Sequence, residues 1–257
     1  MVNREILVES GLIVLLYMTA VFIFALVKKN NSIVDIFWGP GFIILTLYSL
    51  FQNPVTDFRK IIVTLLVILW AMRLSVHIYL RNKGNPEDFR YKHWRNTWKF
   101  FILRSYFQIF ILQGILMLVI AAPVYFINFY SSEPLGVWDS LGLVVFGCGF
   151  LIETLGDQEL ISFKKDPANK GMLMTTGLWK YSRHPNYFGE SLVWWGLALY
   201  ALSVQGGWMT LISPIVLTLL LRFVSGVPML EKKFESRPGW EEYKAKTAAF
   251  VPFIRFL

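Results

Sequence analysis

Long apolar runs separated by shorter polar stretches dominate the pattern along this chain. A helix needs about 20 mostly apolar residues to cross the hydrocarbon core of a bilayer. Runs near that length recur from one end to the other, with no internal repeat, low-complexity run or soluble domain between them. The pattern predicts an all-α polytopic membrane protein, a single membrane-embedded domain over 1–257, with about seven transmembrane helices at 5–27, 33–51, 61–80, 101–128, 137–161, 187–203 and 208–228.

Composition strengthens this prediction and narrows the possible partners. Hydrophobic residues make up 55% of the chain and charged residues only 16%, whereas a soluble domain carries about a quarter charged residues. The net charge of +8 does not require nucleic acid, because membrane proteins collect basic residues on their cytoplasmic side. The first apolar run is not followed by a small-residue cleavage site, so we expect a retained helix rather than a signal peptide.

Cysteine and histidine usage argues against a metal centre. Cys148 is the one cysteine of the chain, which excludes an intrachain disulfide and a cysteine-based metal site. The three histidines are scattered and show no metal-ligand spacing. We therefore expect no metal.

The distribution of Lys and Arg predicts an orientation. If the N-terminus is outside, 21 of the 25 basic residues fall in segments 28–32, 81–104, 162–186 and the tail after about residue 222. This bias predicts an N-terminus outside and a cytoplasmic C-terminus. The inside loops are also the long, polar and aromatic ones, so chemistry is expected on the cytoplasmic side.

The segment 176–190 concentrates more chemistry than any other stretch. Pro185 suits the first turn of a helix, and Asn186 and Glu190 then share one face at i and i+4. Arg183 and His184 come just before that start, where helix N–H groups attract anions. A plain basic loop would explain the cation, but not the amide and carboxylate on the entering turn.

Asp35 is the first ionisable group inside an apolar run. It could be a first-turn acid behind a Ser32 or Asn31 cap, favoured by the helix dipole. It could instead be a proton donor facing a substrate cavity, with the Gly39-Pro40-Gly41 sequence breaking the helix beside that cavity.

Two further spans carry polar groups at helical spacing. Arg73 and His77 are i and i+4 and present one face, either as a pocket wall or as snorkelling side chains. Glu153, Asp157 and Lys164 share a stripe at the end of the fifth span. That stripe could bind a ribose or an amide and then a phosphate, or form a salt-bridged helix end.

The loop 81–98 and the tail 231–243 complete the polar material. Arg90 and Tyr91 lie in the loop, where basic and aromatic residues alternate. Such a loop can anchor the protein at the interface, or pair with a phosphate and stack on adenine. The amphipathic tail can lie on the membrane or cover the site. No GxGxxG or P-loop motif is present, so any nucleotide must be held among helices and loops.

The motif Gly177-Leu178-Trp179-x3-Arg183-His184-Pro185-Asn186-Tyr187-x-Gly189-Glu190 resembles the C-terminal signature of membrane steroid 5-alpha reductases and sterol C14 reductases. Its Arg-His-Pro-x-Tyr core also occurs in isoprenylcysteine carboxyl methyltransferases and phospholipid methyltransferases. The whole chain resembles the bacterial branch grouped with the 5-alpha reductases, most specifically over 150–257.

The resemblance implies a seven-helix bundle with NADPH in a cytoplasm-facing cavity. The enzyme would be a 3-oxo-steroid 5-alpha-reductase-like oxidoreductase acting on CH–CH groups, passing hydride to the C=C bond of an enone in a steroid-like or isoprenoid lipid. The cofactor-binding residues implied by the motif and its neighbours are Asp157, Lys164, Trp179, Arg183, His184, Asn186, Tyr187, Glu190, Glu231 and Tyr243, to which the loop adds Arg90 and Tyr91.

The chain departs from that family at two places. The reductases' substrate-polarising tyrosine in span three has no clear match, because Arg73 or His77 occupies that region. A histidine-rich stretch before the tail is replaced by residues 225–228. The candidate catalytic residues are accordingly Asp35, Arg73 and His77, with a protonated Asp35 stabilising the developing negative charge on the enone oxygen.

Two enzyme classes stay open, together with a non-catalytic lipid-binding or scaffold protein. The alternative to the reductase is an S-adenosylmethionine-dependent lipid or isoprenylcysteine-type methyltransferase. The cluster of Arg and Lys favours NADPH, which carries a 2′-phosphate and a pyrophosphate. We expect a monomeric integral protein of the bacterial inner (cytoplasmic) membrane that takes a lipid substrate from the bilayer and opens to the cytoplasm.

Overall fold

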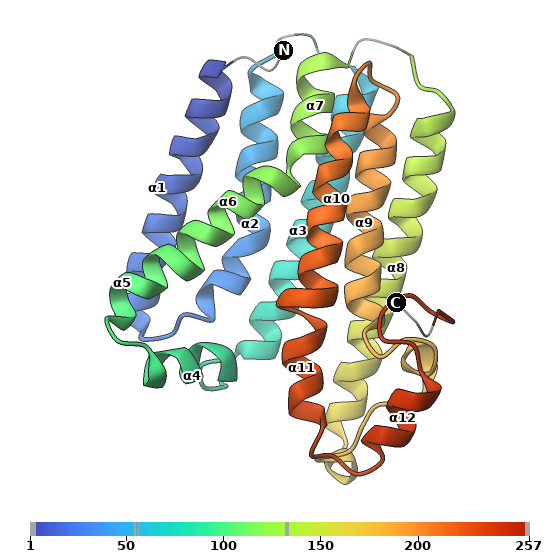
Figure 1. Cartoon of the computed structure of the whole chain (residues 1–257). Coiled ribbons are helices and arrows are strands. Elements are labelled where there is room, and N and C mark those ends of the chain that lie inside the picture. The colour runs from blue at the N-terminus through green and yellow to red at the C-terminus, as the bar shows by residue number, and fades with distance from the viewer. Residues whose placement is uncertain (1–3, 54, 56, 132–133, 255–257) are drawn as a thin grey trace. The chain divides into compact units, whose positions relative to one another are not determined.

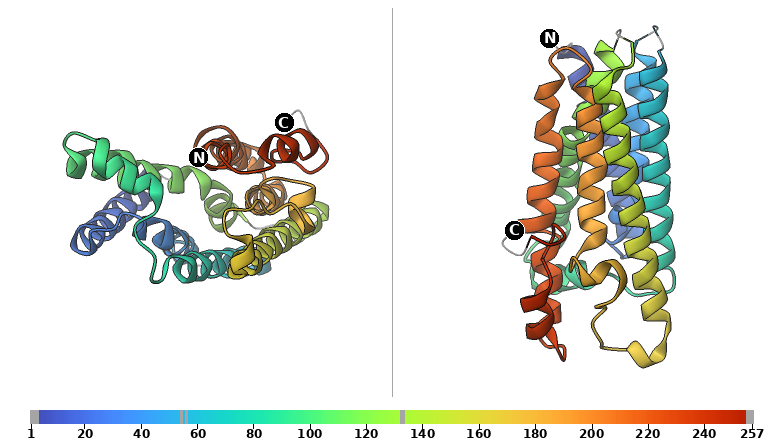
Figure 2. Two further views of the ribbon diagram at one scale, coloured as in Figure 1. Left: turned by 90° about the horizontal axis from the view of Figure 1, so that it is seen from below. Right: turned by 90° about the vertical axis from the view of Figure 1, so that its right-hand side faces the viewer.

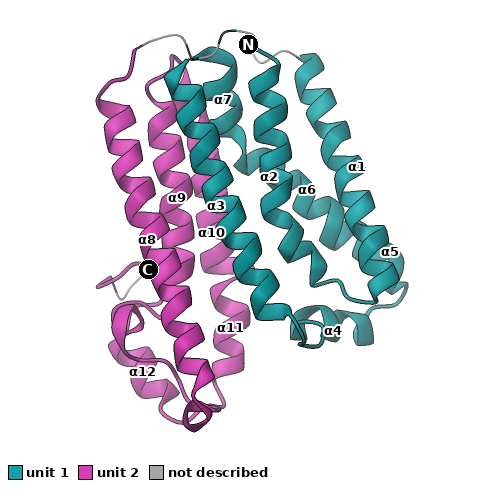
Figure 3. Ribbon diagram, turned by 180° about the vertical axis from the view of Figure 1, so that it is seen from behind, with its two compact units in different colours: residues 1–133 teal, residues 134–257 magenta. Residues whose placement is uncertain are grey.

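The computed structural model describes residues 4–53, 55, 57–131 and 134–254. Within these residues the chain is helical and forms no β-strand; an isolated parallel bridge joins Ser182 to Ala248. The chain divides into two compact units, Met1–Glu133 and Pro134–Leu257 (Figure 3). Each unit is described by itself, and the single domain over 1–257 stays a prediction.

The first unit is a set of long upright helices with one oblique helix against them (Figure 1). Its helices are α1 (Arg4–Lys28), α2 (Ile33–Phe51), α3 (Phe58–Asn82), α4 (Phe89–Thr97), α5 (Phe101–Ser105), a π-helical turn (Tyr106–Ile111), α6 (Leu112–Ile120) and α7 (Ala122–Tyr130). The expected span 101–128 is therefore several helices. It divides at Ala121, because Pro123 belongs in the first turn of a new helix.

The Gly39-Pro40-Gly41 sequence does not break α2, contrary to the sequence-based expectation. The helix runs through Pro40 without interruption. The hydroxyl of Tyr17 donates to the carbonyl of Phe37 at 2.6 Å, which satisfies a carbonyl close to the proline. A Cβ at Gly39 would clash with the backbone carbonyl of Ala71 on α3, so the glycine allows these two helices to approach closely.

The second unit is built on α8 and α9, which run side by side over most of their length (Figure 2). Its helices are α8 (Val137–Lys165), short 3-10 turns at Pro167–Asn169 and Gly177–Lys180, α9 (Pro185–Ala201), a 3-10 turn at Gly207–Leu211, α10 (Ile212–Leu219), a π-helical turn (Leu220–Val224), α11 (Val227–Phe234) and α12 (Trp240–Lys246). As expected, Pro185 occupies the first turn of α9.

Glycines seven residues apart bring α8 and α9 into backbone contact. A Cβ at Gly149 would lie 2.6 Å from the amide nitrogen of Val193 and 2.7 Å from the carbonyl oxygen of Gly189. A Cβ at Gly142 would lie 2.7 Å from the carbonyl oxygen of Gly196. Small residues at such positions let membrane helices pack closely.

Six helices in the described residues are long and apolar enough to cross a membrane. They are Arg4–Lys28, Ile33–Phe51, Phe58–Asn82, Phe101–Ile120, Val137–Lys165 and Gly207–Phe234. The remaining expected span, 187–203, corresponds to α9, which has 17 residues. The chain thus has the character of an integral membrane protein, and the orientation of its termini stays a prediction.

Candidate functional site

Arg183 ties the start of α9 to the C-terminal tail. Its Nε donates to Glu231 Oε1 at 2.7 Å, and its Nη1 donates to the carbonyls of Lys244 at 3.1 Å and Thr247 at 2.5 Å. Its backbone N–H donates to the carbonyl of Ala248 at 2.8 Å. The guanidinium is buried, and its principal contacts are with the protein itself.

Neighbouring residues of the same segment make similar internal contacts. The hydroxyl of Ser182 donates to the carbonyl of Phe250 at 2.7 Å, and the indole of Trp179 donates to the carbonyl of Gly156 at 3.0 Å. The hydroxyl of Tyr243 donates to the carbonyl of Trp179 at 2.6 Å. The sequence analysis expected four of these residues to bind the cofactor: Trp179, Arg183, Glu231 and Tyr243. In this structure their side chains form hydrogen bonds within the second unit.

His184 is buried and lies beside aromatic and charged groups. Its ring stacks with Tyr187, 5.7 Å between centroids, and with Phe234, 6.4 Å between centroids. Its Nε2 lies 3.4 Å from Glu231 Oε1, in ion-pair range but without hydrogen-bond geometry. Burial lowers the pKa of His184, and nearby cations including Arg222 lower it further against the opposing effect of Glu231.

His184 should make the protein sensitive to acid. Because its folded pKa is below the unfolded value near 6.5, the unfolded chain binds the proton more tightly, and stability falls as the pH drops below about 6.5. We expect His184→Asn to reduce the fall in thermal midpoint between pH 7 and pH 5.5. An unchanged pH profile in that variant would contradict the assignment. His93, an exposed histidine of the first unit, provides the control through His93→Asn.

Asn186 and Asp157 join α9 to α8 through a hydrogen bond. Asn186 Nδ2 donates to Asp157 Oδ1 at 3.0 Å, which fixes the orientation of the amide because a carboxylate only accepts. Oδ1 of Asn186 is buried and has no hydrogen-bond partner within the described residues. Glu190 follows one turn later on the same helix, half-buried, and Lys164 is exposed near the end of α8. This side of the helix pair can accept a hydrogen bond from a ligand.

Arg222 was not singled out by the sequence analysis as a site residue. It lies in the π-helical turn Leu220–Val224, and π-helical turns occur frequently at functional sites. Its Nε is buried without a hydrogen-bond partner in the described part of the chain. In the sequence, Arg222 is a cation at the end of an apolar run. The preference of basic residues for the cytoplasmic side already accounts for such a cation, so it did not indicate a site.

Asp35 lies in a charged network of the first unit. Its Oδ2 is 2.8 Å from Arg90 Nη2, and its Oδ1 accepts a hydrogen bond from the hydroxyl of Tyr91 at 2.6 Å. Arg90 also pairs with Asp88 at 2.9 Å. The side chain of Ser32 makes no cap and instead accepts from the N–H of Asp88 at 2.7 Å. Both the guanidinium of Arg90 and the phenol of Tyr91 thus bind the side chain of Asp35 within the first unit.

Tyr91 is the buried donor of this network. The residue is only 3% exposed. Burial raises the pKa of its phenol well above the usual range, and the charge of Asp35 adds to the shift. The phenol therefore keeps its proton at neutral pH. Arg73 and His77, the other expected catalytic residues, lie half-buried on α3.

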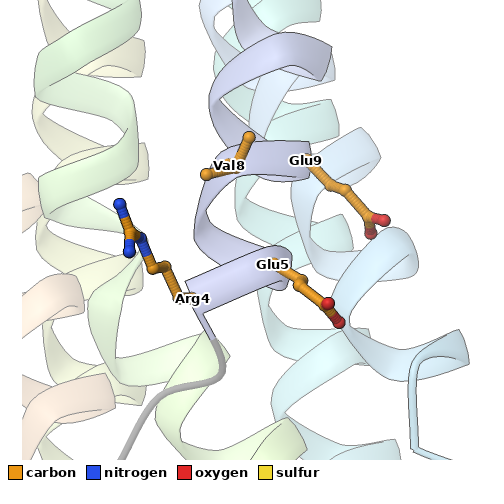
Figure 4. Close-up of a pocket in the computed structure, with 4 residues that line it drawn as sticks. All are labelled: Arg4, Glu5, Val8 and Glu9. Carbon is orange, nitrogen blue, oxygen red and sulfur yellow. The ribbon is translucent and has the colours of Figure 1, made fainter.

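Potential metal ligands and a surface depression were also considered as places for a ligand site. No group of three or more potential metal ligands occurs in the described ranges. An open depression at the start of α1 is lined by Arg4, Glu5, Val8 and Glu9 (Figure 4). All four residues come from one helix, at the end of α1 far in sequence from the turn that leads to Asp35, so this depression is no part of the polar networks.

The fold and the polar network at the start of α9 place the chain in the broad class of helical membrane proteins. Comparison with known proteins identifies the family within that class. The chain belongs to the family described as "Protein of unknown function (DUF1295)", whose model matches residues 21–247 and which is steroid 5-alpha reductase-like. No solved structure gives a significant match.

Several proteins are similar over parts of the chain. An uncharacterized protein of Schizosaccharomyces pombe is 28% identical over 87% of this chain and 73% of its own length. The steroid 5-alpha-reductase DET2 of Solanum lycopersicum is 28% identical over 51% of this chain, and that of Gossypium hirsutum is 33% identical over 30%. The chain spans 48% and 30% of these two reductases. A probable O-methyltransferase of Ustilaginoidea virens is 40% identical over 23% of this chain.

Proposed function

We propose that this protein reduces the C=C bond of an enone in a steroid-like or isoprenoid lipid, with NADPH as the reductant. Family membership and the similarity to two steroid 5-alpha reductases support a reductase. The structural observation that carries the cofactor assignment is the buried Oδ1 of Asn186, an acceptor without a partner among the described residues.

The residues around Asn186 fit a nicotinamide. A carboxamide offers N–H donors to the oxygen of Asn186 and a carbonyl to a cation, for which we propose Arg222, whose charge acts on the nearby His184. Asp157 holds the amide of Asn186 in the required orientation at 3.0 Å. An unpaired buried acceptor costs about 1–3 kcal/mol, so a ligand that supplies the donor recovers this free energy. Glu190 and Lys164 are the proposed neighbours for the rest of the nucleotide.

NADPH would supply the hydride, and the chain would stabilise the negative charge that develops on the carbonyl oxygen. The phenol of Tyr91 is not available for that task, because it donates its one proton to Asp35 at 2.6 Å. Asp35, Arg73 and His77 stay the proposed catalytic residues.

Cofactor titration of the detergent-purified protein tests the proposal. NADPH should raise the thermal midpoint, and Asn186→Ala and Glu190→Ala should each weaken NADPH binding at least about tenfold, the loss of one buried hydrogen bond. Gln158→Ala, an exposed amide beside Asp157, should bind NADPH as the original chain does. Unchanged affinity in both site variants would remove the assignment.

The second candidate is a lipid methyltransferase that uses S-adenosylmethionine. The partial similarity to a probable O-methyltransferase favours it. S-adenosylmethionine is therefore included in the same titration. Stabilisation by S-adenosylmethionine, with none by NADPH, would replace the reductase proposal by this one.

A further inference from the structure

Residues 83–104, which contain the short helix α4 and the segments on either side of it, form a cationic surface at one end of the first unit. Figures 1 and 3 show α4 lying across the ends of the long helices of that unit rather than along them. This is the orientation of a helix that lies flat at the surface of a bilayer. The junction continues through residues 98–100 into α5.

Internal ion pairs neutralise the acids of this surface. Glu87 accepts two hydrogen bonds from Arg95, both at 2.8 Å, and Asp88 pairs with Arg90 at 2.9 Å. No carboxylate of the described residues forms an ion pair with the exposed cations that remain, which are Lys83, Lys92, Lys99 and Arg104. The surface therefore keeps a positive charge that other parts of the protein do not compensate.

Phe100, in the junction between α4 and α5, is strained and exposed. Its φ of 54° and ψ of 43° place it in the left-handed region, which is unfavourable for an aromatic residue. Its side chain is 82% exposed, and Ile102 and Leu103 beside it are 61% and 60% exposed. The exposed side chain gains little packing within the unit to offset this strain, and a partner outside the chain could supply such contacts.

Aromatic residues hold the neighbouring cation in place. Trp94 and Trp98 stack with 5.1 Å between their centroids, and the guanidinium of Arg104 lies 5.0 Å from the ring of Trp98. A guanidinium stacked on its face keeps its N–H groups at the edge for a phosphate. Indole rings are also enriched where a membrane meets water.

We propose that Lys92, Lys99 and Arg104 bind the phosphate of anionic phospholipids, while Phe100 inserts among the acyl chains. The two observations require the same partner. Cations alone would suit any polyanion, but a soluble anion offers nothing to an exposed apolar cluster. An anionic bilayer surface supplies phosphate to the cations and hydrocarbon to Phe100 at once. This site is independent of the proposed reductase activity.

The test uses the full chain in nanodiscs of phosphatidylcholine with and without phosphatidylglycerol. Retained phosphatidylglycerol is counted by native mass spectrometry after detergent extraction. Replacing all three cations (Lys92→Gln, Lys99→Gln, Arg104→Gln) should weaken its retention about a hundredfold, since each basic residue contributes about a factor of five near an anionic surface. The control variant Lys165→Gln, Lys170→Gln, Lys232→Gln removes the same charge from exposed positions elsewhere and should retain the lipid within about twofold.

Three results would contradict the proposed binding of anionic phospholipid. Equal losses in both triple variants, or no loss in either, would overturn the proposal, as would full competition by inorganic phosphate. Phe100→Gly tolerates the left-handed backbone and removes the ring, so it should fold normally and retain the lipid several-fold less well. Unchanged retention in that folded variant would overturn the insertion of Phe100.

Discussion

Replacing Gly149 by alanine is expected to destabilise the second unit severely. The new methyl carbon would lie 2.6 Å from the amide nitrogen of Val193 and 2.7 Å from the carbonyl oxygen of Gly189. Both atoms belong to the backbone of α9, so no side chain can turn away to make room. Overpacking costs about 1–3 kcal/mol where neighbours can adjust, and we expect at least the upper end here. The thermal midpoint of the detergent-purified protein measures the loss.

Gly147 provides a matched control two residues earlier on α8. A Cβ at Gly147 meets nothing within 4 Å. Alanine is the better helix former by about 1 kcal/mol, so Gly147→Ala should leave the midpoint unchanged or raise it. The same change is thus expected to lower the midpoint at Gly149 and not at Gly147. Equal midpoints for the two variants would show that α8 and α9 are not in backbone contact.

The sequence predicts where these helices are much better than how they pack. Apolar length sets the span 33–51, and α2 runs over Ile33–Phe51. The contact between α8 and α9 escapes the same reasoning, because a glycine every seven residues looks like any other small residue in an apolar run. Pro40 shows the opposite error. Its breaking tendency was predicted from local geometry, but α2 continues through Pro40.

The candidate site could be predicted in composition but not in connectivity. The motif identified Arg183, Asn186 and Glu190 as unusual polar residues at the start of α9, and the structure places them there. A sequence does not indicate which polar groups bind each other across 29 positions, as Asn186 and Asp157 do. The sequence did not indicate that Ser182 binds the tail, because a serine in a basic loop is common and need not have a partner. Residues assigned to the cofactor thus also form internal hydrogen bonds, and their role in cofactor binding stays a prediction.

Arg183→Ala is the second change with a large expected effect. It removes the donor of three internal hydrogen bonds, to Glu231, Lys244 and Thr247, and leaves the carboxylate of Glu231 largely buried beside a neutral histidine. Breaking a buried ion pair by removing one partner costs about 3–5 kcal/mol. We expect the tail 235–254 to be released, with faster proteolysis of that segment and a lower thermal midpoint.

Arg183→Lys separates this structural role from a role in cofactor binding. An ammonium is a single compact charge and cannot reach Glu231 and the two tail carbonyls together, as the guanidinium does through Nε and Nη1. The lysine variant should therefore lose tail protection even without NADPH, whereas Lys180→Ala, an exposed cation of the same segment, should not. If Arg183 served the cofactor alone, the lysine variant would be as resistant to proteolysis as the original chain, and the difference between them would appear only when NADPH is added.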